Sequence, residues 1–306
     1  MSSDLVAEME DIRLAIALMA FISIAAFTLT YRLFRHQSHL ILDVSAFGIV
    51  CTIVAYVYVV WGQLWIVKWI PLPSVIILSN WFPPLLASLA AVVWIRLLHT
   101  TVLRRLPVML MLFVAAVYSL TYFIPTEAPE CGDEWVRPNN TFLLPVCRQT
   151  TKFTCSAAAA ATVLNAFGIP ATEQEMARLC LTRSGTTWLG LYHGLSTKLL
   201  GTNLRVTFLE GEIQDLERHV STSPILLCCR LDPQVAEQAP EYVNTGGWIP
   251  GTAHTVVYFG RIGDKHLIGD PSQGYEAWST QDLSLLWTGT GLSITELPVA
   301  SETKQN

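Results

Sequence analysis

The stretch 147-CRQTTKFTCSAAAAATVLNAFGIP-170 decides the fold of the second half of this 306-residue chain. Alanine has the highest helix propensity, and the five consecutive alanines predict a helix over residues 157–167. Gly168 is placed to end that helix as a C-terminal cap. Thr154 is a candidate N-cap, which puts Cys155 in the first helical turn.

The position of Cys155 favours a reactive thiolate. Unpaired backbone N–H groups and the helix dipole stabilise negative charge at a helix N-terminus, and this lowers the pKa of a thiol there. Gln149 lies six residues earlier. A side-chain amide near a nucleophile can stabilise the oxyanion that forms during acyl transfer, with the backbone N–H of Cys155 as a second donor. These two residues are therefore a candidate nucleophile and a candidate oxyanion donor.

His254 is the candidate general base among the seven histidines. It opens an apolar run over 255–260 that predicts a buried strand, and a Gly-rich loop over 246–251 precedes it. A second predicted strand, 266–269, ends at Asp270. An antiparallel hairpin brings the start of one strand beside the end of the next, so we expect His254 and Asp270 to lie close together. A carboxylate in that place fixes the imidazole tautomer and supports its positive charge.

These motifs occur in the order found in a known family. The chain resembles the bacteriocin-processing cysteine peptidases of the papain-like superfamily in Gln149-x5-Cys155, in His254-Thr-Val-Val and in Asp270-Pro-Ser-Gln-Gly, with a match over 145–297. Such domains usually form the N-terminal part of ABC exporters and cut after a double glycine. The resemblance implies Cys155 as nucleophile, His254 as general base, Asp270 as orienting residue and Gln149 as oxyanion donor. It also implies a peptide or protein substrate, no cofactor, and a possible separate exporter partner.

The chain departs from that family in three ways. Ser156 and Thr255 stand where the family often has other residues. No Gly-x4-Gly-Lys-Ser/Thr motif occurs, so the chain carries no ATPase of this type. The peptidase-like part follows a membrane region, whereas in the exporters it precedes one. These differences bear on the substrate more than on the chemistry.

The first half of the chain predicts a membrane region. Mean hydropathy is +0.42, only 14% of residues are charged, and a spanning helix needs about 20 apolar residues. Acidic residues precede the first apolar run, so it is not a signal peptide. We expect four spans: Leu14–Leu33, Leu40–Trp61, one within Ile70–Leu98, and Leu106–Ile124. An interfacial or re-entrant segment over Leu64–Ile77 is the alternative for part of this region.

The domain organisation follows from this contrast in composition. We expect a transmembrane helical region over 1–125, a linker over 126–144, and an α+β papain-like peptidase domain over 145–300. Asp43 lies near a span end and is expected at the interface with the headgroups. The lipid bilayer is therefore a partner, and the net charge of −5 gives no reason to expect nucleic acid.

Basic residues beside the spans predict the orientation. Lys and Arg concentrate in cytoplasmic loops. Most of the basic residues lie in two predicted loops. The loop between the first two spans holds Arg32 and Arg35, and the loop between the third and fourth spans holds Arg96, Arg104 and Arg105. Both loops should therefore be cytoplasmic, with both termini and the peptidase-like domain outside the cytoplasm.

The cysteines outside the candidate site have other expected roles. Cys131 and Cys147 flank a short polar segment, and a disulfide between them would suit an oxidising compartment. The same segment contains a glycosylation sequon, 139–141. Cys228 and Cys229 lie in an apolar strand and are expected to pack in the core. No Cys–His cluster has zinc spacing, so no metal site is predicted.

Two other functions fit the same residues. A papain-like acyltransferase or deamidase would use the same Cys-His-Asp set on another acceptor or amide. A non-enzymatic membrane receptor or assembly factor could carry a decayed peptidase domain, but the candidate Cys, His and Gln are all present. We therefore rank peptide-bond hydrolysis first.

Overall fold

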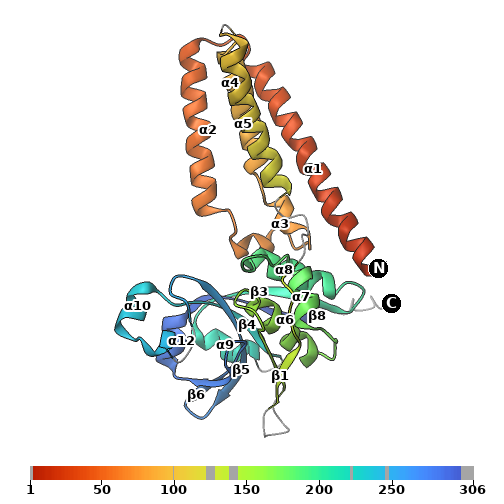
Figure 1. Cartoon of the computed structure of the whole chain (residues 1–306), viewed down its shortest axis with the longest axis vertical. Helices are drawn as coiled ribbons and strands as arrows, with labels where there is room; N and C mark the ends of the chain where they lie inside the picture. Colours follow the sequence, from red (N-terminus) through yellow and green to blue (C-terminus); the bar gives the residue numbers. More distant parts are fainter. Residues whose placement is uncertain are drawn as a thin grey trace, which may run out of the picture. The chain divides into compact units, whose positions relative to one another are not determined.

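The computed structural model divides into two compact units, Met1–Ile124 and Pro125–Asn306 (Figure 1). The structure describes residues 3–98, 100–121, 128–137, 144–220, 223–244 and 248–297, and for residues 3–10 it describes the backbone only.

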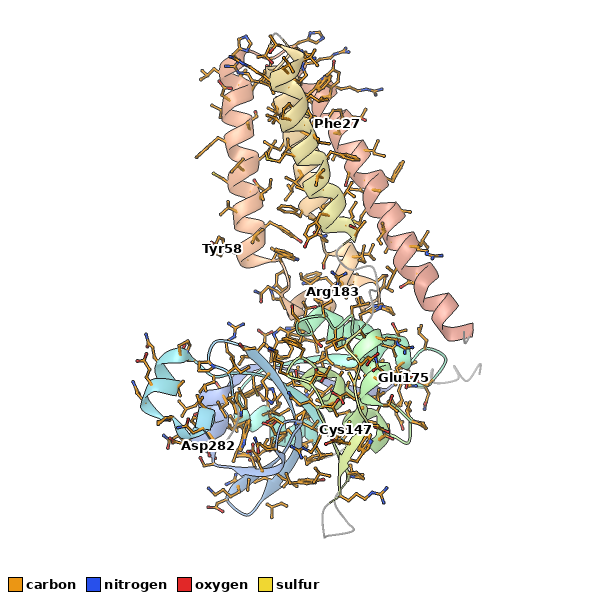
Figure 2. All side chains as sticks on the ribbon, viewed as in Figure 1. Phe27, Tyr58, Cys147, Glu175, Arg183 and Asp282 are labelled. Carbon is orange, nitrogen blue, oxygen red and sulfur yellow. The ribbon has the colours of Figure 1, made fainter. Side chains whose placement is uncertain are left out.

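The first unit contains four helical segments that are long and apolar enough to cross a membrane, as predicted. They are α1 (Ser3–Phe34), α2 (His39–Val59), the pair α3 (Val75–Leu78) and α4 (Phe82–Arg96), and α5 (Val102–Thr121). Large apolar side chains on these helices are exposed, among them Tyr58, which points away from α2 (Figure 2). A surface of this kind suits hydrocarbon rather than water.

The third span is interrupted where the sequence has Ser79-Asn80-Trp81. Two prolines open α4, where a helix tolerates the missing N–H groups. Side chains compensate for the break: Tyr56 donates to the Ser79 carbonyl at 2.6 Å, and Asn80 Nδ2 donates to the Ser119 carbonyl at 2.9 Å. The segment before it forms a short 3-10 helix, η1 (Leu64–Lys68). Polar side chains therefore satisfy the backbone where the third span is broken.

One detail of this unit differs from the sequence interpretation. The fourth helix begins at Val102 and not at Leu106, so Arg104 and Arg105 lie in its first turns. Arg105 reaches back to donate to the Leu98 carbonyl at 2.8 Å, which explains how a basic residue is accommodated there. Asp43 on α2 forms an ion pair with Arg96 on α4 at 2.9 Å.

The second unit is built on a six-stranded antiparallel sheet with strand order β3-β8-β4-β5-β6-β7. A separate two-stranded ladder joins β1 (Glu134–Val136) to β2 (Val146–Arg148). The sheet strands are β3 (Leu204–Glu210), β4 (Ile225–Arg230), β5 (Ala253–Ile262), β6 (Lys265–Asp270), β7 (Gly274–Trp278) and β8 (Trp287–Glu296). The helices are α6 (Cys155–Ala166), α7 (Glu173–Leu179), α8 (Trp188–Lys198), α9 (Ile213–Val220), α10 (Pro233–Gln238), α11 (Glu241–Asn244) and α12 (Thr280–Leu286).

Helix α6 packs against β5, β4 and β2. All five alanines of its run are fully buried, because the absence of longer side chains lets the helix approach its neighbours closely. The opposite face of β5 carries Val256 and Tyr258 into an apolar core that α9 and α12 cover with Leu216 and Leu283. The sheet is therefore covered on both faces at β5.

The predicted helix is confirmed, with Cys155 in its first turn as expected. Thr154 does not cap it with its side chain. The Thr154 hydroxyl donates instead to the Thr151 carbonyl at 3.1 Å, which tightens the loop before the helix. Thr172 and Thr187 do cap α7 and α8, accepting from Glu175 N and Gly190 N.

The expected disulfide between Cys131 and Cys147 is not formed, and both are free thiols. Cys147 is buried on β2, where its N–H donates to Thr162 of α6 at 2.9 Å (Figure 2). The Cys131 sulfur contacts the Pro129 carbonyl at 3.1 Å instead. The sequon at 139–141 lies outside the described residues.

Candidate active site

Cys155 is the first residue of α6 and contacts His254. Burial raises the pKa of the Cys155 thiol, but the hydrogen bond to His254 and its charge, together with the Thr255 N–H and the Ser156 hydroxyl, lower it below its ordinary value. The thiol expected at the helix start is therefore held beside the expected base, and these contacts shift it toward the thiolate form.

His254 Nε2 lies 2.9 Å from Asp270 Oδ1. This bond leaves Nδ1 of the same ring for Cys155. Burial lowers the pKa of His254, but the charge of Asp270 and its hydrogen bond, with the contact to Cys155, raise it to about 10. The imidazolium form of His254 is therefore favoured, and a positive charge beside the sulfur is what an activated Cys–His pair requires.

A β-bulge in the hairpin brings His254 and Asp270 to the same face. Gly260 pairs with Leu267, whereas Tyr258 pairs with Ile268, so β5 contains one extra residue between these pairs. The shifted register puts Asp270 opposite Val256, on the face that also carries His254. Without the bulge, Asp270 would lie opposite Val257, whose side chain points to the other face of the sheet. The predicted hairpin is correct, but its simple form would have separated the two side chains.

Asp270 is fully buried and strongly hydrogen-bonded through one oxygen. Its Oδ1 accepts from the Ser272 N–H and from the Ser272 hydroxyl, both at 2.7 Å, as well as facing His254. Burial raises the pKa of Asp270, but the charge and hydrogen bond of His254 and the Ser272 contacts lower it. The carboxylate is therefore ionised and fixed in orientation, as an orienting residue requires.

Trp248 packs its ring against His254, with ring centroids 4.8 Å apart and an interplanar angle of 64°. Trp248 also contacts Trp278 at 5.8 Å, and both indoles are buried. These rings shield the His254–Asp270 pair from water, which strengthens its electrostatic interaction. The sequence interpretation assigned neither indole a contact with His254, although Trp248 lies within the Gly-rich loop over 246–251.

Gln149 lies at the loop that follows Asp270. Its N–H donates to the Pro271 carbonyl at 2.8 Å, and its Nε2 donates to the Thr151 carbonyl at 2.9 Å. Its Oε1 is buried and finds no hydrogen-bond partner among the residues that the structure describes. The Thr151 carbonyl uses one of the two Nε2 hydrogens, and the second remains for a substrate oxygen.

Glu173 holds the same loop from behind. This fully buried carboxylate at the start of α7 accepts from the Thr150 N–H at 2.9 Å and from the Thr150 hydroxyl at 2.8 Å. A helix N-terminus stabilises the negative charge of such a residue. The loop from Gln149 to Cys155 is thus fixed at Pro271 and at Glu173, a support that the sequence interpretation did not foresee.

One other cysteine lies beside this site. Cys229 on β4 pairs with His254 on β5, and burial, with the charges of Cys228 and Asp270, raises the pKa of its thiol well above the ordinary value. Burial raises the pKa of Cys228 to about 12, so its thiol stays protonated, in line with the expected packing role. Within the described ranges, no group of three or more His, Cys, Asp or Glu side chains could hold a metal ion.

Comparisons with known proteins find similarity at the level of structure. No protein-family model and no curated protein matches the chain. The peptidase domain of Streptococcus ComA, a bifunctional ABC transporter involved in a quorum-sensing pathway, is 19% identical with a TM-score of 0.38, over 49% of this chain and 96% of that one. A double-glycine-motif protease from an AMS/PCAT transporter, solved in complex with the leader peptide, is also 19% identical, with a TM-score of 0.38. That match covers 53% of this chain and 99% of the protease.

A third similar structure comes from a different system. The periplasmic domain of the EpsAB fusion protein of the Vibrio vulnificus type II secretion system is 12% identical with a TM-score of 0.30, over 48% of this chain and 49% of that one. The chemistry proposed below therefore rests on the geometry around Cys155, His254 and Asp270.

Proposed function

We propose that this chain is a membrane-anchored cysteine peptidase that hydrolyses peptide bonds in a peptide or protein precursor. Cys155 is the nucleophile, His254 the general acid and base, Asp270 the orienting residue and Gln149 an oxyanion donor. The observation that carries the proposal is the contact of Cys155 with His254, together with the 2.9 Å bond from His254 to a buried Asp270.

The cycle begins with a thiolate and an imidazolium. The Cys155 sulfur attacks the peptide carbonyl carbon, and the oxygen takes the negative charge of a tetrahedral intermediate. The Gln149 amide and the Cys155 N–H stabilise that charge. His254 protonates the leaving amine, which departs and leaves a thioester. Water then attacks the thioester while His254 accepts its proton, and the carboxylic acid leaves as the thiolate reforms.

A cleavage assay on the full chain in detergent micelles tests this function. The purified protein is incubated with a complex peptide mixture, and new termini are identified by mass spectrometry. Cys155→Ala should abolish the cleavage, while Cys51→Ala, which removes an exposed thiol of the first unit, should leave it unchanged. Undiminished cleavage by the Cys155→Ala protein would overturn the proposal. A parallel reaction with an added primary amine at low concentration separates hydrolysis from acyl transfer, because a hydrolase releases mainly the free acid whereas a transferase forms the amide of the added amine.

We further propose that the peptidase domain faces the extracytoplasmic side and acts near the bilayer, with an exporter as a separate partner. The basic residues of the two predicted loops support this side. A cysteine introduced at Glu130 in a Cys131→Ser background should react with a membrane-impermeant maleimide in intact cells. Labelling only after cell lysis would place the domain in the cytoplasm and refute this part.

A further inference from the structure

Two hydroxyl residues directly follow the candidate nucleophile and base, and their side chains meet. Ser156 Oγ lies 2.8 Å from Thr255 Oγ1, and both residues are buried, with 3% and 0% of their surface exposed. The contact joins α6 to β5, the two elements that carry Cys155 and His254. Ser156 Oγ also lies 4.0 Å from Cys155 Sγ, at the outer limit of a hydrogen bond to sulfur.

The direction of the Ser156–Thr255 bond follows from counting hydrogens. Each hydroxyl has one hydrogen to donate. If Ser156 donated to Thr255, the Thr255 hydrogen would have no acceptor among the described residues, and a buried unpaired donor is unfavourable. If Thr255 donates to Ser156, the Ser156 hydrogen is free to point at the Cys155 sulfur. The second arrangement uses both hydrogens and directs a donor at the thiolate.

We propose that Ser156 and Thr255 are positioning residues that form a hydroxyl chain, in which Thr255 donates to Ser156 and Ser156 donates to the Cys155 thiolate. The same bond holds the start of α6 against the start of β5, and so keeps the sulfur beside the imidazole. This inference rests on the proposed function of Cys155 as a nucleophile. It explains why two hydroxyls occupy a buried contact where alanine and valine would fill the space.

The ionisable groups around Cys155 do not change in the test. His254 contacts the sulfur, and Asp270 lies behind it. The elements that pack against α6 (β2, β4, β5, α7 and α8) carry further ionisable residues, and these are Cys147, Arg148, Glu173, Glu175, Arg178, Tyr192, His193, Lys198, Cys228, Cys229, Arg230, Tyr258 and Arg261. All of them are retained in the variants, so a shift in the titration of Cys155 would report the hydroxyls.

Thr255→Val tests the chain with a side chain of nearly the same shape. It removes the donor to Ser156 but keeps the Thr255 N–H that also faces Cys155. Thr255→Ser restores the hydroxyl and should behave like the parent protein. Ser156→Ala removes the final donor. Thr207→Val is the matched control, because it breaks a similar hydroxyl pair, with Thr295 at 2.9 Å, far along the sheet on β3 and β8.

The measurement is the pH dependence of Cys155 alkylation by iodoacetamide in the full chain in detergent. Trypsin releases the fragment Phe153–Arg178, in which Cys155 is the sole cysteine, so mass spectrometry follows this thiol alone. Thr255→Val and Ser156→Ala should each move the midpoint of the profile upward by about one pH unit, since hydrogen bonds to charged groups are among the stronger ones. Thr255→Ser and Thr207→Val should leave it unchanged.

The outcomes separate this inference from the proposed function. A parent midpoint at the ordinary thiol value of about 8.5 would refute the activated nucleophile and with it the proposed function. A low parent midpoint that Thr255→Val leaves in place would overturn the hydroxyl chain alone. Thermal unfolding of each variant checks the fold, and the Thr255→Val and Thr255→Ser pair decides the matter if Ser156→Ala does not fold.

Discussion

The two ends of one hairpin hold two histidines in opposite states. At one end His254 faces the carboxylate of Asp270, and its pKa is raised. At the other end His266 lies between the Tyr258 hydroxyl and the Thr280 hydroxyl, each at 3.2 Å. Burial lowers the pKa of His266, and the charge of Arg261 lowers it further. Two imidazoles on neighbouring strands, His254 partly buried and His266 fully buried, therefore differ in charge because one has an ionised partner and the other has neutral partners.

The largest expected effect comes from removing each histidine in turn. His254→Ala should lower kcat by about 10⁵-fold or more, because loss of the base disables a Cys–His pair as a unit. His266→Ala should keep kcat and lower the melting temperature, since it removes a buried side chain. Cleavage rates and thermal unfolding of both variants check this. A comparable loss of kcat in both variants would contradict the prediction that only His254 takes part in catalysis.

Asp270→Asn turns the environment of His254 into one with a neutral partner, like that of His266. We expect kcat to fall on the order of 10³–10⁴-fold, because a neutral amide no longer supports the imidazolium or fixes its tautomer. The pH at which Cys155 becomes alkylated should rise as well. Asp282→Asn is the control, since Asp282 is held by Ser279 and Tyr242 near the His266 end. Retained activity in Asp270→Asn would show that the charge of Asp270 is not what makes His254 differ from His266.

Gly260→Ala should disturb the register that brings His254 to Asp270. Gly260 lies at the bulge with φ of 118°, a conformation that L side chains rarely adopt. We expect a loss of about 1–3 kcal/mol in the free energy of unfolding. Loss of the productive geometry should also lower kcat by about 10- to 100-fold.

Gly263→Ala is the control for that substitution. Gly263 has φ of 63° in the hairpin turn, so alanine strains it too, but no pairing shift lies beyond it. It should destabilise the chain by about 1 kcal/mol and leave kcat intact. Denaturant unfolding and cleavage rates together decide this, and equal kcat losses in both variants would contradict a specific role of the bulge.

The smallest expected effect is an opposite pH dependence of stability at the two ends. The raised pKa of His254, about 10, means that its contribution is complete below the unfolded value of about 6.5 and is lost as the pH rises toward 10. The pKa of His266 is lowered in the folded chain, so the unfolded chain binds a proton at this residue more readily. The folded state therefore loses stability as the pH falls below about 6.5.

Melting temperatures of His254→Gln and His266→Gln between pH 5 and 9.5 measure this. The destabilisation by His254→Gln should shrink toward high pH, and that by His266→Gln should shrink toward low pH. Parallel pH profiles for the two variants would mean that both histidines share one charge state.

The sequence by itself determined the long elements and named the candidate site residues. The alanine run predicted a helix that begins at Cys155, because propensity and close packing favour the same residues. The apolar length of the first half predicted four segments able to span a membrane. Short or unpatterned elements were missed, among them β7 and α12, since their residues gain their structure from the sheet and core that they join.

Only the tertiary structure decided how those residues meet. Sequence spacing predicted a hairpin near Asp270, but the bulge before Gly260 changes which face each side chain occupies, and such a shift depends on pairing between strands. The contacts of Glu173 with Thr150 and of Ser156 with Thr255 join residues far apart in the chain. Local pattern carries no information about such contacts, because folding alone brings their partners together.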